Sequence, residues 1–117
     1  MGKSVLLSKI RTEIRRREMS YRTEQIYIGW ITRFIYYHNL KHPQNMGEQE
    51  VVKFLNYLVT NRNVTDSIQT QARQAIQFLY SHIIGKPLPS LKGIVKGEAP
   101  YIYQSRNGNG KQRLSVS

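Results

Sequence analysis

Apolar side chains recur at helical spacing in four stretches of the chain, and short polar or proline-containing segments separate them. In the first stretch the apolar positions are Val5, Leu6, Ile10 and Ile14. The spacing predicts four helices, over residues 4–18, 20–39, 48–61 and 66–84. No strand alternation, internal repeat or heptad run is visible. The predicted fold class is therefore all-α, a compact four-helix bundle.

The second stretch has the strongest pattern. At 100° per residue, one face collects Thr23, Tyr27, Trp30, Ile31, Phe34 and His38. The opposite face collects Arg22, Gln25, Gly29, Thr32, Arg33 and Tyr36. Ser20 is placed to cap the helix, because its hydroxyl can accept a free backbone N–H of the first turn. One side of this helix is thus suited to a core, and the other to solvent or a polar partner.

The third and fourth stretches differ in their polar faces. The third has an apolar stripe of Val51, Phe54, Leu55, Leu58 and Val59, and is interpreted as a packing helix. The fourth, between a Thr65 cap and Gly85, has apolar positions at Ile68, Ala72, Ala75, Ile76, Leu79 and Ile83. Its polar positions are Asp66, Thr70, Arg73, Gln74, Gln77 and Ser81. Glutamine and arginine pair with base edges, although such a face can also be merely solvated.

The second and fourth helices are expected to pack as antiparallel rods. Their apolar sides would then face inward, and their arginines and amides would lie on one shared outward surface. The charge supports a polyanionic partner for such a surface, because the chain carries a formal charge of +11. The basic excess is concentrated in residues 1–45 and 86–117, whereas residues 46–85 are neutral.

Two further basic positions are candidates. Arg15 and Arg16 lie in a run of three arginines at the end of the first helix, where phosphate contact and a solubilising surface are both open interpretations. Lys41 lies in the turn after the second helix, where Pro43 prevents helix continuation.

Several classes of function find no support in the sequence. The chain has no cysteine, and its three histidines are scattered without metal-ligand spacing, so no metal or cofactor is predicted. No apolar run approaches the roughly 20 residues of a membrane span. No nucleophilic triad, paired carboxylates or phosphate loop is present. We therefore expect a cytoplasmic protein with neither membrane nor small-molecule partner.

Proline, glycine, serine and asparagine accumulate from Lys86 onward. This composition predicts an irregular linker and a basic tail over 86–117, disordered from about Gln104. The predicted helical domain spans residues 4–85.

The motifs along these helices resemble those of a known family. They include Ser20-Tyr21-Arg22-Thr23-Glu24, Tyr27 with Trp30, His42-Pro43, Phe54-Leu55, Arg62-Asn63-Val64 and Phe78-Leu79-Tyr80. Over about residues 5–96 the chain is similar to the N-terminal core-binding (SAM-like) domain of tyrosine recombinases, and within that family to integron integrases.

The resemblance implies a domain that forms one jaw of a clamp around a recombination half-site. Its partners would be double-stranded DNA and other recombinase protomers. Arg22 and Thr23, at a helix start, would meet phosphate. Arg33, Thr70, Arg73, Gln74 and Gln77 would lie along the duplex. The full set of candidate DNA-binding residues is Arg15, Arg16, Arg22, Thr23, Gln25, Arg33, Lys41, Thr70, Arg73, Gln74 and Gln77.

In the family this domain leads into a catalytic domain with a tyrosine nucleophile. Here the resemblance fades after about Lys96, and no His-x-x-Arg occurs. The expected protein is therefore not an enzyme by itself, but a truncated or remnant recombinase or a free-standing DNA-binding module. The alternative is a protein-interaction bundle that modulates a full-length recombinase. It is motivated by an excess of aromatic residues at Tyr36, Tyr37, Tyr57 and Phe78.

Overall fold

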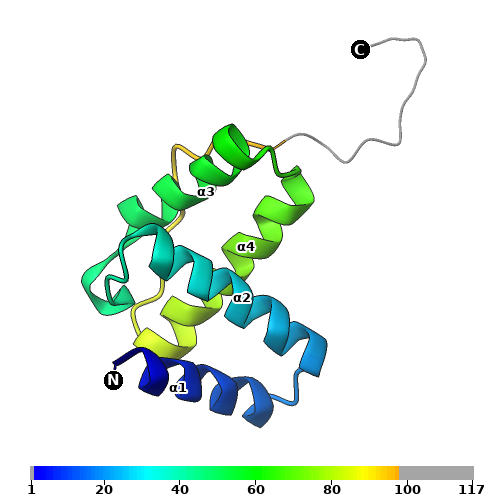
Figure 1. Ribbon diagram of the computed structural model, residues 1–117, viewed down its shortest axis with the longest axis vertical. Helices are drawn as coiled ribbons and strands as arrows, with labels where there is room; N and C mark the ends of the chain where they lie inside the picture. The colour runs from blue at the N-terminus through cyan, green and yellow to red at the C-terminus, as the bar shows by residue number, and fades with distance from the viewer. Residues whose placement is uncertain (1, 98–117) are drawn as a thin grey trace, which may run out of the picture.

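The computed structural model describes residues 2–97, with side chains from residue 5 onward. Its elements are α1 (Gly2–Arg16), α2 (Tyr21–Tyr37), the 3-10 helix η1 (Pro43–Asn45), α3 (Glu48–Arg62), α4 (Asp66–Phe78) and the π-helix η2 (Leu79–Ile84) (Figure 1). No strand occurs in this part of the chain. The predicted all-α fold is confirmed. The predicted disordered end lies outside the described residues.

The predicted caps are in place. The backbone N–H of Thr23 donates to the Ser20 hydroxyl over 3.0 Å, and that of Ile68 donates to the Thr65 hydroxyl over 3.3 Å. Each bond satisfies a donor that the first turn of a helix leaves free. Gly85 ends η2 with a φ of +81°, a left-handed conformation that favours glycine.

The end of the fourth predicted helix departs from α-geometry. Residues 66–84 are helical throughout, but the last six form the π-helix η2, which hydrogen bonds over one more residue than an α-helix. Tyr80, absent from the predicted apolar face, is 1% exposed, and its hydroxyl donates to the Pro43 carbonyl over 2.7 Å. Burial raises the pKa of this phenol. The π-turn thus anchors the loop around η1 to the core.

Phe34 lies at the centre of the core with no exposed surface. Its ring centroid is 5.6 Å from that of Phe54, 5.3 Å from that of His38 and 6.5 Å from that of Tyr80. The Nε2–H of His38 donates to the Glu50 carbonyl over 2.9 Å. Aromatic edge-to-face contacts of this kind add to the free energy of simple area burial, so this cluster joins α2, α3 and η2.

Two residues of the predicted apolar faces are exposed rather than buried. Val5 is 53% exposed and Ile68 is 38% exposed, so neither contributes to the core. Both lie near the beginning of a helix, where fewer neighbouring elements cover the side chain. The other predicted apolar positions of the first helix, Leu6, Ile10 and Ile14, are buried.

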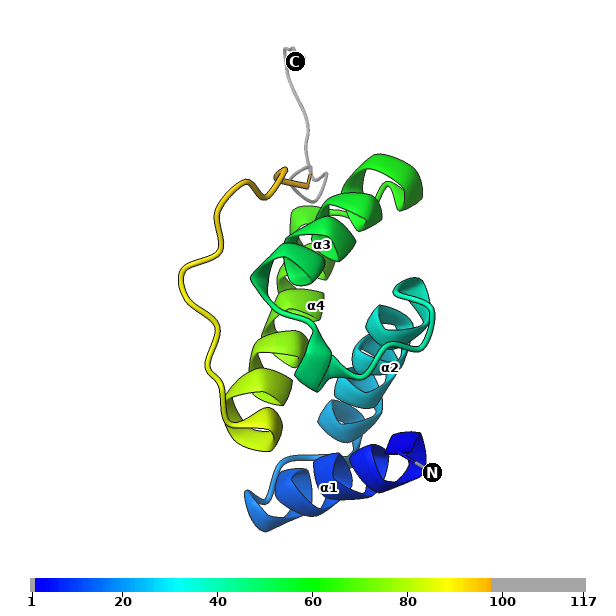
Figure 2. The ribbon, with the colours of Figure 1, turned by 90° about the vertical axis from the view of Figure 1, so that its left-hand side faces the viewer.

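The helices are arranged differently from a bundle of antiparallel rods. Figure 1 shows α2 crossing in front of α4 at a large angle, and Figure 2 shows α1 lying across the end of both. At the crossing, the indole N–H of Trp30 donates to the Gln71 side-chain oxygen over 2.9 Å, and the rings of Tyr27 and Phe78 lie 5.3 Å apart. The expected antiparallel packing is wrong, because a hydrophobic pattern defines which face is buried but not the angle at which side chains interlock.

Residues 86–97 are irregular, as predicted, but they pack against the helices. Figure 2 shows this segment running back along α4 to the far end of the molecule. Asn56 accepts from the backbone N–H of Val95 over 2.6 Å and donates to the Gly93 carbonyl over 3.0 Å. Gln69, only 5% exposed, donates to the Val95 carbonyl over 2.7 Å and accepts from the N–H of Gly97 over 3.3 Å. We therefore place residues 86–97 within the folded unit, beyond the predicted boundary at residue 85.

Gly97 supplies a test of this packing. A Cβ at this position would lie 2.7 Å from the Asp66 nitrogen and 2.8 Å from the Thr65 carbonyl carbon, both backbone atoms that cannot yield easily. We expect Gly97→Ala to lower the free energy of unfolding by about 1–3 kcal/mol, as overpacking does. The measurement is urea denaturation followed by circular dichroism.

The matched control is Gly29→Ala within α2, where a Cβ meets nothing within 4 Å. Alanine at this helical position should leave stability unchanged or raise it by up to about 1 kcal/mol. Equal stability of the two variants would contradict the close packing of residues 86–97 on α4.

Candidate nucleic-acid interface

The arginines at the end of α1 are held by carboxylates. Glu24 of α2 is 3% exposed and accepts two hydrogen bonds from Arg15, each 3.1 Å long. Arg11 reaches the same carboxylate at 3.7 Å. The hydrogen bonds from Arg15 raise the pKa of its guanidinium. This buried carboxylate therefore positions two arginines at the junction of α1 and α2 and partly neutralises them. Sequence reasoning included Glu24 in a motif but gave it no role.

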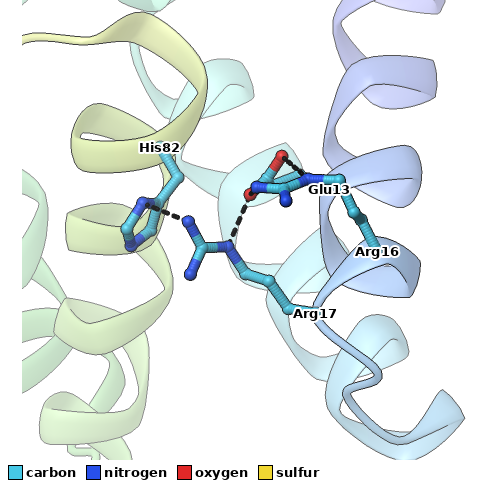
Figure 3. Close-up of polar contacts among 4 residues, drawn as sticks. All are labelled: Glu13, Arg16, Arg17 and His82. Atoms are coloured by element: carbon cyan, nitrogen blue, oxygen red, sulfur yellow. Dashed lines mark hydrogen bonds and ion pairs between the residues drawn. The ribbon is translucent and has the colours of Figure 1, made fainter.

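A second carboxylate holds the other two arginines. Glu13 accepts from Arg16 over 2.6 Å and from Arg17 over 2.5 Å (Figure 3). These two hydrogen bonds, that from Arg16 first, lower the pKa of Glu13 to about 2. Arg17 also donates to Nδ1 of His82 over 3.0 Å, which ties the end of α1 to η2. Four guanidinium groups surround two carboxylates at this end of the molecule, so the cluster stays positive while every arginine in it is paired.

The polar face of α2 is open to solvent. Arg22, Gln25 and Arg33 are all exposed. Thr23 is half-buried and its hydroxyl accepts from that of Ser20 over 3.0 Å, so it is engaged in the helix cap. The Arg33 guanidinium lies 4.9 Å from the centre of the Trp30 ring, a cation–π arrangement that orients it.

The polar face of α4 is also uncovered. Gln74 and Gln77 are exposed, and Thr70 and Arg73 are half-buried. None of the four is sealed under another helix. Gln71, which sequence reasoning missed, joins this face to α2 through its hydrogen bond with Trp30. No sequence pattern marks it, because an indole and an amide 41 residues apart become partners only through the crossing of the helices.

The candidate residues therefore fall into separate places. Arg33 of α2 lies over Trp30, which in turn donates to Gln71 at the crossing with α4. Arg15 and Arg16 lie at the end of α1. Lys41 lies in a hollow of about 440 Å³ at the other end of α2, with Asn39, Glu50 and Lys53. A helix of 17 residues is about 25 Å long, so Arg22 and Lys41 are far apart.

The described residues show neither a metal site nor a helix that could span a membrane. Within residues 2–97 no cluster of three or more histidine, cysteine, aspartate or glutamate side chains is placed to hold a metal ion. In the same range, no helix combines the length and apolar character needed to cross a membrane.

Comparison with known proteins shows the family to which the chain belongs. Residues 6–90 match the family described as "Phage integrase, N-terminal SAM-like domain". The chain belongs to this family. It is also 38% identical over 89 residues to proteins named "Integrase/recombinase" from Escherichia coli and from Pseudomonas aeruginosa. The aligned region covers 76% of this chain and 26% of each relative, so the chain spans about a quarter of the length of these curated relatives. The predicted membership in the integrase family is confirmed.

The Glu13 cluster predicts a pH dependence. A carboxylate whose folded pKa is lowered from its ordinary value of 4.5 to about 2 contributes stability that is fully present above pH 4.5 and is lost as the pH falls through 2. We expect Glu13→Gln to lower the melting temperature at pH 6, and the difference from the unsubstituted chain to vanish toward pH 2. Thermal melts followed by circular dichroism at a series of pH values measure this.

The control for this experiment is Glu18→Gln, at an exposed carboxylate that makes no ion pair within the described part of the chain. Its difference in melting temperature should stay small and nearly constant from pH 6 to pH 2. A Glu13→Gln difference that does not change with pH would contradict the ion-pair assignment.

Proposed function

We propose that the chain is the DNA-binding module of a site-specific tyrosine recombinase of the integron-integrase type. It binds duplex DNA at a recombination half-site, through phosphates and the major groove, and has no catalytic activity by itself. The observation that carries the proposal is the crossing of α2 and α4. There, Trp30 contacts Arg33 of α2 and donates to Gln71 of α4, and exposed polar residues of both helices, including Arg33 and Gln74, lie open to solvent.

Charge adds a second line of support. The chain carries +11, and the four arginines of α1 and its end retain a net positive charge after pairing with two carboxylates. Phosphates attract such surfaces without regard to base sequence. The exposed Gln74 and Gln77, together with Arg73, are side chains that can form bidentate hydrogen bonds with base edges. Positioning on the backbone is therefore assigned to the arginines of α1 and α2, and base contact to α4.

The assembly around the DNA follows from the same proposal. The integrase family and the half-site expectation imply that other recombinase protomers are partners on adjacent half-sites, in the cytoplasm. The catalytic residues of such a complex would come from a further domain, since this chain aligns with only 26% of the length of its curated relatives.

Of the four aromatic residues that motivate the alternative, a protein-interaction bundle, only Phe78 is buried. Phe78 is 8% exposed and its ring packs against that of Tyr27, while the rings of Tyr37 and Tyr57 lie 4.6 Å apart. Phe78 therefore belongs to the core, whereas Tyr37 and Tyr57 are partly exposed and Tyr36 is 55% exposed.

The salt dependence of DNA binding tests the proposal. In band-shift titrations, the logarithm of the affinity should fall linearly with the logarithm of the salt concentration between about 50 and 200 mM. Replacing both Arg22 and Arg33 by glutamine should weaken binding to all sequences and reduce the salt slope by about 2, since each neutralised phosphate contributes about 0.9. Lys53→Gln on α3, the control, should leave both quantities nearly unchanged. An affinity for DNA that does not change with salt concentration would contradict the proposal.

Base contact by α4 is tested separately. Replacing Arg73 and Gln77 by alanine should narrow the difference in affinity between a half-site and random DNA by about 1–3 kcal/mol for each bidentate pairing with a base that is removed. Binding to random DNA should change much less, because these side chains are assigned to bases. The measurement is a competition titration against random duplex at fixed salt. A uniform decrease on both DNAs would move these residues to the phosphate-binding group.

A further inference from the structure

A groove opens on the surface of the domain, and no residue of α1 lines it. It has a volume of about 840 Å³ and lies between α2, α3 and the start of α4. Its lining residues are Trp30, Arg33, Tyr36, Tyr37, Phe54, Tyr57, Leu58, Arg62, Val64 and Ile68. The floor contains the buried Trp30, Phe54 and Leu58, whereas Tyr36 and Ile68 are two of the large apolar side chains that the described fold leaves exposed. The groove thus has an apolar floor and an accessible apolar rim.

The charge in the groove is uncompensated. Its charged lining residues are Arg33 and Arg62, both exposed, and no carboxylate lines it. Neither arginine takes part in an ion pair within residues 5–97. This contrasts with α1 and its end, where Arg11, Arg15, Arg16 and Arg17 all face carboxylates. Two cations beside an apolar floor are complementary to a segment that carries both carboxylates and apolar side chains.

We infer that this groove is a docking site for an acidic segment of a partner protein. The segment would place aliphatic or aromatic side chains on the floor and carboxylates against Arg33 and Arg62. An amphipathic helix laid into a groove is a recurring form of such recognition. Arginine and aromatic residues are also the side chains that contribute most to binding energy at protein interfaces.

Other occupants fit less well. A second copy of this chain also carries +11, so two copies would repel one another. A nucleic acid would find aromatic rings for stacking, but Leu58, Val64 and Ile68 add aliphatic surface that stacking does not use. Docking of an acidic segment is separate from the proposed DNA binding. Arg33 and Trp30 are common to the two surfaces, whereas Arg62 and Ile68 can be changed without touching the residues assigned to DNA.

The test uses a displayed library of random 16-residue peptides, selected for binding to the full chain. Trp30 is the single tryptophan and lines the groove, so its fluorescence reports occupancy directly. Selected peptides should be enriched in acidic and in aliphatic or aromatic residues and should shift the Trp30 emission. Their affinity should fall roughly tenfold or more in the double variant Arg62→Gln with Ile68→Ser, because it removes one of the two cations and one exposed apolar side chain of the groove.

The matched control is the double variant Val5→Ser with Lys53→Gln, which removes one exposed aliphatic side chain and one positive charge outside the groove. Peptide affinity should change less than about twofold in it. Circular dichroism melts check that both variants fold, and band shifts with duplex DNA should give equal affinities for both. Absence of duplex binding in every variant would affect the proposed function alone.

Three results would overturn the docking site. They are selected peptides without an acidic bias, equal decreases of peptide affinity in the groove and control variants, and a failure of the library to yield any peptide that shifts Trp30 emission. If instead an oligothymidylate shifts the Trp30 emission and the groove variant abolishes that shift, the occupant is a single-stranded nucleic acid, and the acidic-segment assignment is wrong.

Discussion

The structure depends on one constraint: α2 packs one side of its surface against four other elements. Glu24 contacts α1, Trp30 contacts α4, and Phe34 contacts α3 and η2. A helix packed in this way has only its opposite side left for a partner. That side carries Arg22, Gln25 and Arg33, and Arg33 belongs both to the proposed DNA interface and to the groove.

Net charge alone does not locate function in this domain. The densest cluster of arginines, at the end of α1, is paired with Glu13 and Glu24, and Arg17 of this cluster also donates to His82 of η2 (Figure 3). Its members hold α1 to the rest of the fold and offer phosphate only the part of their charge that pairing leaves. Arg33 and Arg62 have no such partners within the described residues.

Much of the fold followed from the sequence, because helix periodicity and caps are local properties. The four helical stretches, the Ser20 and Thr65 caps, the Gly85 ending and the burial of Phe34 were all predictable from spacing and side-chain chemistry within a few residues. The polar faces of α2 and α4 were predictable for the same reason. The integrase family was recognisable because several motifs occur in order along these helices.

Only the tertiary structure decided how those faces meet. Helix α2 crosses α4, and at the crossing Trp30 bonds to Gln71. Arg15 pairs with Glu24, and residues 86–97 pack back against the helices. All of these contacts join residues far apart in the chain. The π-turn that buries Tyr80 shifts the spacing on which the sequence argument relied. Periodicity defines the side of a helix that is buried, whereas crossing angles and long-range polar partners depend on how whole side chains interlock, which local spacing does not encode.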